Sequence, residues 1–323
     1  MAHIRWPNRG SMQYWPRSRA KRIYPAVKYW AANVKDIKPL GFAGYKVGMT
    51  HILYTDAKST SMTKGEDIFC PVTIIECPPL KVAAARFYKN SPYGQKVITD
   101  VFYSKLDKDL ARSIFLSKKE PSKKLEDVKE FDDLKLVVYT QPKLSAIGKK
   151  KPEIFEVALG GSKDDKLKYA SENLCKEISI NNVFKEGQQV DIHSVTKGKG
   201  FQGPVKRFGV RVRQHKSEKT KRGPGSLGAW KAQGHIMYRV PHAGQTGFQT
   251  RTEFNKWVVK IGSKPEEINT SAGFVRYGNV KSSYLLLKGC IGGASKRLIR
   301  MTDATRPNKA IQKDPANIQF ISK

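Results

Sequence analysis

Six residues, GKGFQG at 198–203, have the G-x-G-x-x-G spacing of a dinucleotide-binding loop. In such a loop the glycines let the backbone approach a pyrophosphate, which rests on the N-terminus of the following helix. Here Pro204, Gly209 and the alternating V-R-V-R at 210–213 predict a turn and a strand in place of that helix. We therefore interpret the glycines as points of tight turning and close approach to a phosphate backbone.

The histidines and cysteines lack the spacing of a metal or catalytic site. The six histidines include no H-E-x-x-H, and neither a Walker A loop nor a G-x-S-x-G elbow is present. The four cysteines form no C-x-x-C pair, which is typical of free, mostly buried thiols in a reducing compartment; they are Cys70, Cys77, Cys175 and Cys290. We therefore expect no enzyme activity, cofactor, bound metal or small-molecule substrate.

Positive charge is the strongest feature of the composition. The 323 residues include 60 Lys and Arg against 28 Asp and Glu, a net charge of +32. A compact protein with this charge repels itself, so a polyanionic partner is expected, and nucleic acid is favoured. The alternative is a membrane surface or an acidic polysaccharide. A membrane-surface binder would show an amphipathic basic helix, whereas the basic segments here are rich in Gly and Pro.

The bases gather in two segments of the chain. Residues 1–35 contain eight bases and no acid, and residues 196–260 contain 15 bases and two acids, whereas 104–170 holds 16 bases and 12 acids. The first 20 residues offer no apolar stretch typical of a signal peptide, and no apolar run is long enough to span a bilayer. We expect a cytoplasmic protein without a membrane partner.

The texture of the sequence predicts a mainly β protein with an α/β insertion. Residues 1–38 form a basic aromatic arm that cannot build a core, so its aromatic rings must pack on something else. Residues 39–82 carry β-branched runs that end at Pro or Gly, which is typical of strands. Residues 83–182 are the insertion, with helical spacing over 103–118 and 122–135 and a strand at 153–161. Strands return over 183–323, interrupted by the basic segment 196–260.

Trp230 lies in the stretch G-S-L-G-A-W-K-A-Q-G, which is glycine-rich and contains no acid. RNA offers looped and unstacked bases on which aromatic rings and guanidinium groups stack. We therefore expect Trp230 and Phe248 to wedge or stack against RNA. The alternative for Trp230 is an anchor in the protein's own core, which its shortage of apolar neighbours disfavours. His235 and His242 are interpreted as RNA-stacking groups or, equally, as structural residues.

Six stretches resemble the universal large-subunit ribosomal protein L three family, in its archaeal or eukaryotic form. They are GYKVGMTHI at 44–52, VTIIECPPL at 72–80, KGKGFQGPVKR at 197–207, LGAWKAQGHIMYRVPHAGQTGF at 227–248, RTEFNK at 251–256 and SKRLIR at 295–300. The archaeal form is favoured, because no long basic tail follows the last stretch. The resemblance implies a translation-protein-type β-barrel with long irregular RNA-penetrating extensions. It also implies that Trp230 is the tip of a finger that approaches the peptidyl transferase centre.

The partners implied by the resemblance are large-subunit rRNA and neighbouring ribosomal proteins, among them L fourteen. The expected function is therefore a structural one in the ribosome, namely binding large-subunit rRNA and helping it to fold. The alternative is an RNA-modifying enzyme with basic targeting extensions. The residues predicted to contact RNA, besides Trp230, Phe248, His235 and His242, are Arg5, Arg9, Arg17, Arg19, Lys21, Arg22, Lys197, Lys199, Lys206, Arg207, Arg211, Arg213, Lys216, Lys219, Lys221, Arg222, Lys231, Arg239 and Arg251.

Overall fold

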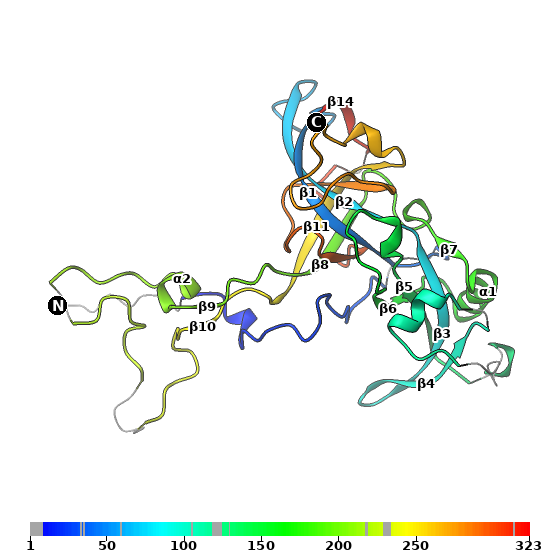
Figure 1. Cartoon of the computed structure of the whole chain (residues 1–323), viewed down its shortest axis with the longest axis horizontal. Coiled ribbons are helices and arrows are strands. Elements are labelled where there is room, and N and C mark those ends of the chain that lie inside the picture. Colours follow the sequence, from blue (N-terminus) through cyan, green and yellow to red (C-terminus); the bar gives the residue numbers. More distant parts are fainter. Residues whose placement is uncertain are drawn as a thin grey trace. The chain divides into compact units, whose positions relative to one another are not determined.

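The computed structural model divides the chain into two compact units (Figure 1). Unit 1 comprises Met1–Arg22 and Val195–Arg251, and unit 2 comprises Ile23–Ser194 and Thr252–Lys323. Each unit therefore joins segments that are far apart in the sequence. The residues that the structure describes are 9–32, 34, 36–58, 60–104, 106–117, 125–128, 130–216, 219–228, 234–312 and 314–323.

A seven-stranded sheet contains strands from both segments of unit 2. Its strands, in spatial order, are β13 (Leu298–Asp303), β8 (Gln189–Val195), β11 (Thr250–Gly262), β12 (Tyr284–Lys288), β2 (Asp67–Glu76), β1 (Gly41–Thr55) and β14 (Asn317–Ile321). A further antiparallel pairing joins β13 to β1 and aligns Met301 with Phe42. These elements confirm the strands predicted within 39–82 and after residue 183. The β-branched and aromatic residues of these runs suit a pleated, buried surface.

A five-stranded sheet forms the second part of unit 2. Strands β4 (Gly94–Phe102), β3 (Leu80–Ser91), β5 (Asp133–Tyr139) and β6 (Ile154–Ala158) are neighbours in that order, and β7 (Glu177–Ile178) pairs with β3. Strand β6 confirms the strand predicted at 153–161. One hydrophobic core includes side chains of both sheets, such as Ile74 and Leu286 from the first and Phe87 and Leu136 from the second.

The prediction of helices over 103–118 and 122–135 was wrong. The described residues there form only the 3-10 helices η2 (Lys108–Arg112) and η3 (Leu125–Asp127), followed by β5. Helix η2 buries Leu110 alone, so it lacks the apolar stripe of a longer helix. In β5, Leu134, Leu136 and Val138 are fully buried at alternate positions, which is the period of a strand.

Short helices complete unit 2. Helix α1 (Lys163–Asn173) begins at a capping box, in which the Ser162 side chain accepts from the Asp165 amide and Asp165 accepts from the Ser162 amide. Short 3-10 helices are η4 (Pro142–Leu144), η5 (Ile180–Asn182) and η7 (Pro265–Glu267). No helix among the residues that the structure describes is long and apolar enough to cross a bilayer.

The Glu76 carboxylate is a buried polar anchor of the seven-stranded sheet. Its side chain is fully buried on β2, between Tyr45 of β1 and Tyr284 of β12 in the strand register. It accepts a hydrogen bond from the Tyr277 hydroxyl and further bonds from the amides of Lys281, at 2.7 Å, and Ser282, at 2.9 Å. The carboxylate therefore holds the turn that leads into β12.

His193 is a second polar group inside this sheet. Its Nδ1 lies 3.0 Å from the Thr252 hydroxyl, and its Nε2 lies 3.2 Å from the Thr302 hydroxyl. Burial, and next the positive charge of Arg300, lowers the pKa of His193 to about 4. The imidazole is therefore neutral at pH 7.

Unit 1 contains little regular secondary structure. The elements among its described residues are η1 (Met12–Tyr14), α2 (Pro204–Phe208) and a two-stranded sheet of β9 (Phe201–Gln202) and β10 (Gly244–Gln245). Helix α2 corrects the prediction of a turn and a strand after GKGFQG. Proline is favoured in the first turn of a helix, so Pro204 starts α2, and Gly209 ends it at φ 70°. Residues 210–213 form no strand.

Candidate nucleic-acid interface

All the residues predicted to contact RNA fall in unit 1. Arg5, Trp230 and Lys231 lie outside the described residues. The other predicted residues divide by exposure. The exposed ones are Arg19, Lys21, Arg22, Lys197, Lys199, Lys206, Arg211, Lys216, Lys219, Arg222, His235 and Arg239. The half-buried ones are Arg9, Arg17, Arg207, Arg213, Lys221, His242, Phe248 and Arg251.

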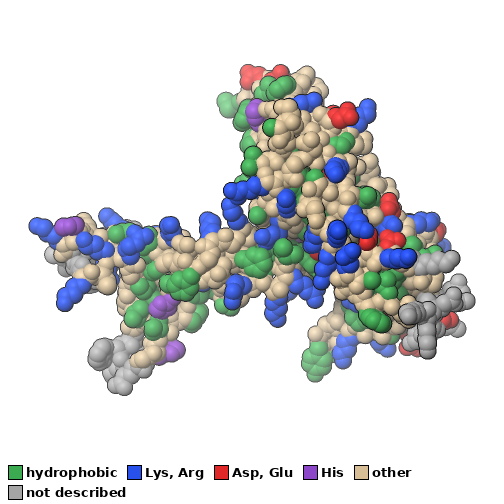
Figure 2. Space-filling model, viewed as in Figure 1, with side chains coloured by type: hydrophobic (Ala, Val, Ile, Leu, Met, Phe, Trp, Pro, Cys, Tyr) green, Lys and Arg blue, Asp and Glu red, His purple; other side chains and the backbone are tan. Residues whose placement is uncertain are grey.

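The charge of unit 1 is almost entirely of one sign. Its sequence contains 19 Lys and Arg and a single acid, Glu218, which is outside the described residues. Among its described residues, 17 are Lys or Arg and none is Asp or Glu. Figure 2 shows Lys and Arg side chains distributed along this unit. A surface of this composition attracts a polyanion.

Arg207 holds together the part of the basic segment 196–260 that lies around α2 and β10. Its Nε donates to the carbonyl of Gln245 at 3.1 Å, and its Nη1 donates to the carbonyl of His242 at 2.9 Å. Gly244 leaves room for this guanidinium, because a Cβ there would lie 3.0 Å from Nη1. Arg207 therefore ties α2 to the returning chain around β10, in addition to its predicted role at phosphate.

Residues 9–22 of the arm pack on the same part of the basic segment. The Ala20 amide donates to the Phe248 carbonyl at 2.8 Å, and the Gln249 side-chain amide donates to the Arg17 carbonyl at 3.3 Å. The Trp15 ring lies 5.3 Å from the Phe208 ring, centroid to centroid. The arm's need for an external packing surface was predicted, and this part of the arm finds that surface within unit 1.

Further along unit 1, a hydrogen bond joins the segment that ends at residue 228 to the segment that begins at residue 234. The Met237 amide donates to the Leu227 carbonyl at 3.3 Å, and the intervening residues 229–233, which include Trp230, lie outside the described residues. Large apolar side chains next to this bond are exposed, among them Leu227, Met237 and Tyr238. Exposed apolar side chains among lysine and arginine residues suit a partner that offers both phosphate groups and the faces of aromatic rings.

Sequence reasoning missed four residues of this interface. Trp15, Phe208 and Tyr14 join the arm to the basic segment through ring contacts, and Gln249 is 6% exposed between them. The aromatic character of Trp15, Phe208 and Tyr14 was a usable signal, whereas Gln249 carried none. Their pairing gave no signal, because about 190 residues separate the two sides in the sequence.

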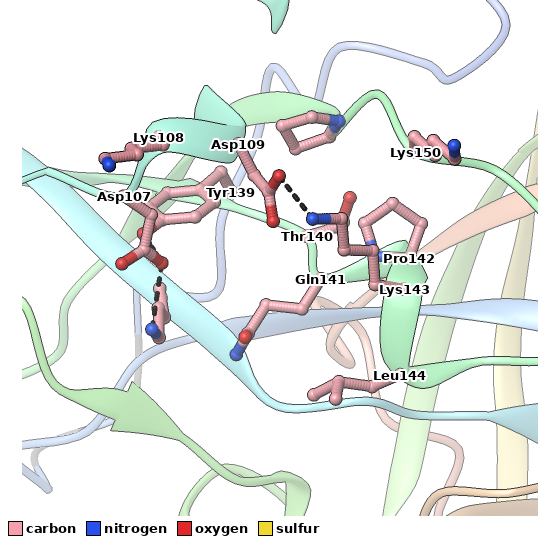
Figure 3. A pocket seen from close by; sticks show the side chains of 12 residues that line it. Asp107, Lys108, Asp109, Tyr139, Thr140, Gln141, Pro142, Lys143, Leu144 and Lys150 are labelled. Carbon is pink, nitrogen blue, oxygen red and sulfur yellow. Dashed lines mark hydrogen bonds and ion pairs between the residues drawn. The ribbon is translucent and has the colours of Figure 1, made fainter. Parts of the chain in front are cut away.

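A pocket of about 450 Å³ lies in unit 2, within the insertion (Figure 3). Its two carboxylates are in ion pairs: Asp107 lies 2.8 Å from Lys81 Nζ, and Asp109 lies 2.5 Å from Lys143 Nζ. The hydrogen bond from Lys81 lowers the pKa of Asp107, and burial raises the pKa of Tyr139, which donates to the same carboxylate. With its pKa lowered, the Asp107 carboxylate is not suited to act as a general acid near pH 7.

The described histidines, cysteines and acids form no group of three that is arranged to hold a metal ion. The four cysteines are free thiols; Cys70 and Cys77 are buried, Cys175 is half-buried and Cys290 is exposed. The expectation of mostly buried thiols therefore holds for two of the four. Burial raises the pKa of the Cys77 thiol well above its usual value, so it is unreactive.

Comparison with known proteins identifies the family. The model of the family described as Ribosomal protein L3 matches residues 1–323. Relatives called Large ribosomal subunit protein uL3 occur in Archaeoglobus fulgidus (45% identical over 322 residues, 98% of this chain and 96% of the relative) and Methanobrevibacter smithii (44% over 326 residues, 98% and 96%). Another, from Methanospirillum hungatei, is 42% identical over 333 residues, covering 100% of this chain and 98% of the relative. The chain belongs to the Ribosomal protein L3 family, whose members are structural components of the ribosome and not enzymes.

Proposed function

We propose that unit 1 binds large-subunit rRNA and helps it to fold, and that the segment around Trp230 is a finger that reaches toward the peptidyl transferase centre. As a member of its family, the chain is a structural constituent of the large ribosomal subunit, in the cytoplasm. The observation that carries the proposal is the set of 17 described bases in unit 1 with no described acid. Such a surface repels itself until phosphates neutralise it.

The backbone of unit 1 also favours RNA over duplex DNA. Proteins that read the DNA major groove usually insert a helix or a two-stranded ribbon of some length. Here α2 has five residues and β9 and β10 have two each. At Gly200, where φ is +69°, a Cβ would meet nothing within 4 Å, so the backbone is open to a close partner. An irregular ribbon of this kind can follow the uneven surface of folded RNA.

The finger assignment is supported by the hydrogen bond between the Met237 amide and the Leu227 carbonyl, which joins the segments on either side of residues 229–233. The sequence between Leu227 and Met237 holds one tryptophan and one isoleucine among small and polar residues. Met237 and Tyr238 are exposed, and the Arg239 guanidinium lies 5.4 Å from the Tyr238 ring. Aromatic rings flanked by guanidinium groups are suited to stack on unpaired bases.

Unit 2 is proposed to be the scaffold that carries unit 1. The β13–β1 pairing links strands from opposite parts of the sheet order, which supports the translation-protein-type barrel implied by the resemblance. From the resemblance alone, we also propose a contact with a neighbouring large-subunit protein of the L fourteen family.

A salt titration of the full chain with a large-subunit rRNA transcript tests the RNA-binding proposal. If about half of the 15 bases between 196 and 260 contact phosphate, log K falls with log salt with a slope of about −5 to −7. Replacing the exposed Lys197, Lys199 and Lys206 by Gln is expected to make the slope shallower by about 2 to 3, through loss of phosphate contacts.

The matched control replaces three exposed lysines of unit 2, Lys108, Lys150 and Lys151, by Gln. The net charge changes equally, but the slope is expected to stay within about 0.5 of the wild-type value. A wild-type slope shallower than about −2 would refute phosphate binding by unit 1. Equal changes in the two triple variants would show that net charge, and not unit 1, governs binding.

A further inference from the structure

The ring of Phe208 is the centre of the contact between the arm and the basic segment. The Trp15 ring lies 5.3 Å from it, the Arg17 guanidinium carbon lies 4.4 Å from its centroid, and the guanidinium carbon of Arg207 lies 5.0 Å from it. Two guanidinium groups from segments far apart in the sequence thus share one aromatic ring. Both are favourably placed on its π system.

A third guanidinium belongs to the same cluster. Arg251 lies 4.3 Å from the Tyr14 ring, and its Nη2 donates to the Gln249 side-chain oxygen at 2.9 Å. Gln249 in turn donates to the Arg17 carbonyl. Burial comes first, and then the positive charges of Arg251 and Arg207, in lowering the pKa of Arg17. Arg17 is therefore close enough to Arg251 and to Arg207 to be repelled by both charges.

The hydrogen-bond acceptors found for these guanidinium groups are all neutral. Arg17 Nη1 donates to the Arg207 carbonyl at 3.4 Å, Arg207 donates to two backbone carbonyls, and Arg251 donates to the Thr250 carbonyl and to Gln249. No carboxylate occurs among the described residues of unit 1 to balance the cluster. A half-buried arginine cluster without an anion is an incomplete arrangement, because charge repulsion and desolvation both oppose it.

Two buried donors at the same ring have no partner. The Nε of Arg17 and the Nε1 of Trp15 are inaccessible to solvent, and neither has an acceptor among the residues that the structure describes. A buried unpaired donor costs about 1 to 3 kcal/mol, and a bound ion that accepts from it would remove that cost. The required acceptor must be anionic to offset three guanidinium charges, and it must offer several oxygens to forked donors.

We propose that Arg17, Arg207 and Arg251 together hold one phosphate group. This phosphate locks residues 9–22 of the arm onto the part of the basic segment around α2 and β10. The site deepens the proposed rRNA function, on which it rests, by making one RNA phosphate a structural part of unit 1. A phosphate presents several oxygens at once and accepts paired donors from arginine. Without it, the repulsion among the three guanidinium groups opens the contact and releases residues 9–22.

Amide hydrogen exchange of the full chain tests the lock. The Ala20 amide donates to the Phe248 carbonyl only when the arm is docked, so its exchange reports docking. Exchange is compared in sodium chloride, in sodium phosphate of equal ionic strength and with an rRNA fragment. We expect Ala20 to exchange about tenfold more slowly with the fragment than in sodium chloride. Slowing in sodium phosphate as well shows that free phosphate suffices, and slowing with RNA alone identifies the backbone as the source.

Arg17→Gln and Arg251→Gln are expected to abolish the protection of Ala20 while RNA binding weakens by less than about tenfold. The Arg251 guanidinium lies on the Tyr14 ring, whereas those of Arg17 and Arg207 lie on Phe208, so the Arg251 variant separates the loss of the anion from the loss of packing on Phe208. The matched control is Arg19→Gln, an exposed arginine of the same arm. It removes the same charge and is expected to keep the protection. Unchanged exchange at Val258, which bonds to Gln188 in unit 2, confirms folding of each variant.

The lock is refuted if Ala20 is equally protected in sodium chloride and with RNA, since ring packing alone would then dock the arm. It is also refuted if Arg19→Gln loses as much protection as Arg17→Gln. Failure of the rRNA proposal has a different signature, which is the absence of salt-dependent RNA binding by the wild-type chain. Steep salt-dependent binding with an unprotected Ala20 overturns the lock alone.

Discussion

Replacing Glu76 by Ala is expected to destabilise unit 2 strongly, because one buried carboxylate anchors three donors. The Tyr277 ring is only 4% exposed, so its hydroxyl would lose its acceptor at a cost of about 1 to 3 kcal/mol. The amides of Lys281 and Ser282 lie nearer the surface and regain part of their bonds from water. With about 1 to 2 kcal/mol for the void left by the side chain, the expected loss is roughly 3 to 5 kcal/mol.

The loss is measured by urea and thermal unfolding of the full chain, followed by circular dichroism. For a unit of this size, each kcal/mol lowers the melting temperature by about 2 to 4 °C, so a decrease of roughly 6 to 20 °C is expected. Glu76→Gln keeps the shape and one acceptor oxygen and is expected to lose about 1 to 2 kcal/mol. The control is Glu66→Ala, at an exposed acid just before β2, with an expected change within about 0.5 kcal/mol. Equal melting temperatures for Glu66→Ala and Glu76→Ala would refute the anchoring role.

Three further outcomes are expected. The pKa of His193 is about 4 in the folded chain, which is below its unfolded value of 6.5. The free energy of unfolding is therefore expected to fall by about 3 kcal/mol as pH drops from above 6.5 toward 4. His193→Gln should remove that part of the pH dependence in urea titrations. Trp230→Ala should leave the melting temperature nearly unchanged, whereas a core tryptophan would cost about 3 to 5 kcal/mol, and should alter chemical reactivity of rRNA near the peptidyl transferase centre. Limited proteolysis of the free chain should cut the arm and residues 210–250 first and spare 72–80 and 283–291; equal resistance of 210–250 in the free and ribosome-bound chain would contradict this.

Much of unit 2 was predictable because strand signals are local. The run VTIIE in β2 and the run YLLLK in β12 have the composition of buried strands, bounded by Pro or Gly. The insertion was less predictable. The stretch over 122–135 has helical spacing, but Leu134 and Leu136 pair in β5 with strands that only the tertiary structure brings beside them. The buried acid Glu76 carries no local signal at all.

The candidate site shows the same division between local and distant information. Clustering of basic residues in two segments was visible in the composition, and the structure places most of the described basic residues of both segments in unit 1, whereas Lys28, Lys256 and Lys260 lie in unit 2. The contact that joins them was not visible, because Trp15 and Phe208 are separated by most of unit 2 in the sequence. The short helix α2 was missed because Pro204 was interpreted as a break, although proline also starts helices.

The central claim is that unit 1 is the part of the chain that contacts rRNA. Ultraviolet cross-linking of intact large ribosomal subunits, followed by mass spectrometry of the RNA-linked peptides, tests it most directly. We expect linked peptides to come mainly from residues 9–22 and 195–251, with exposed Tyr238 among the linked positions. Linked peptides that come mainly from unit 2, with those of unit 1 remaining free of RNA, would contradict the claim.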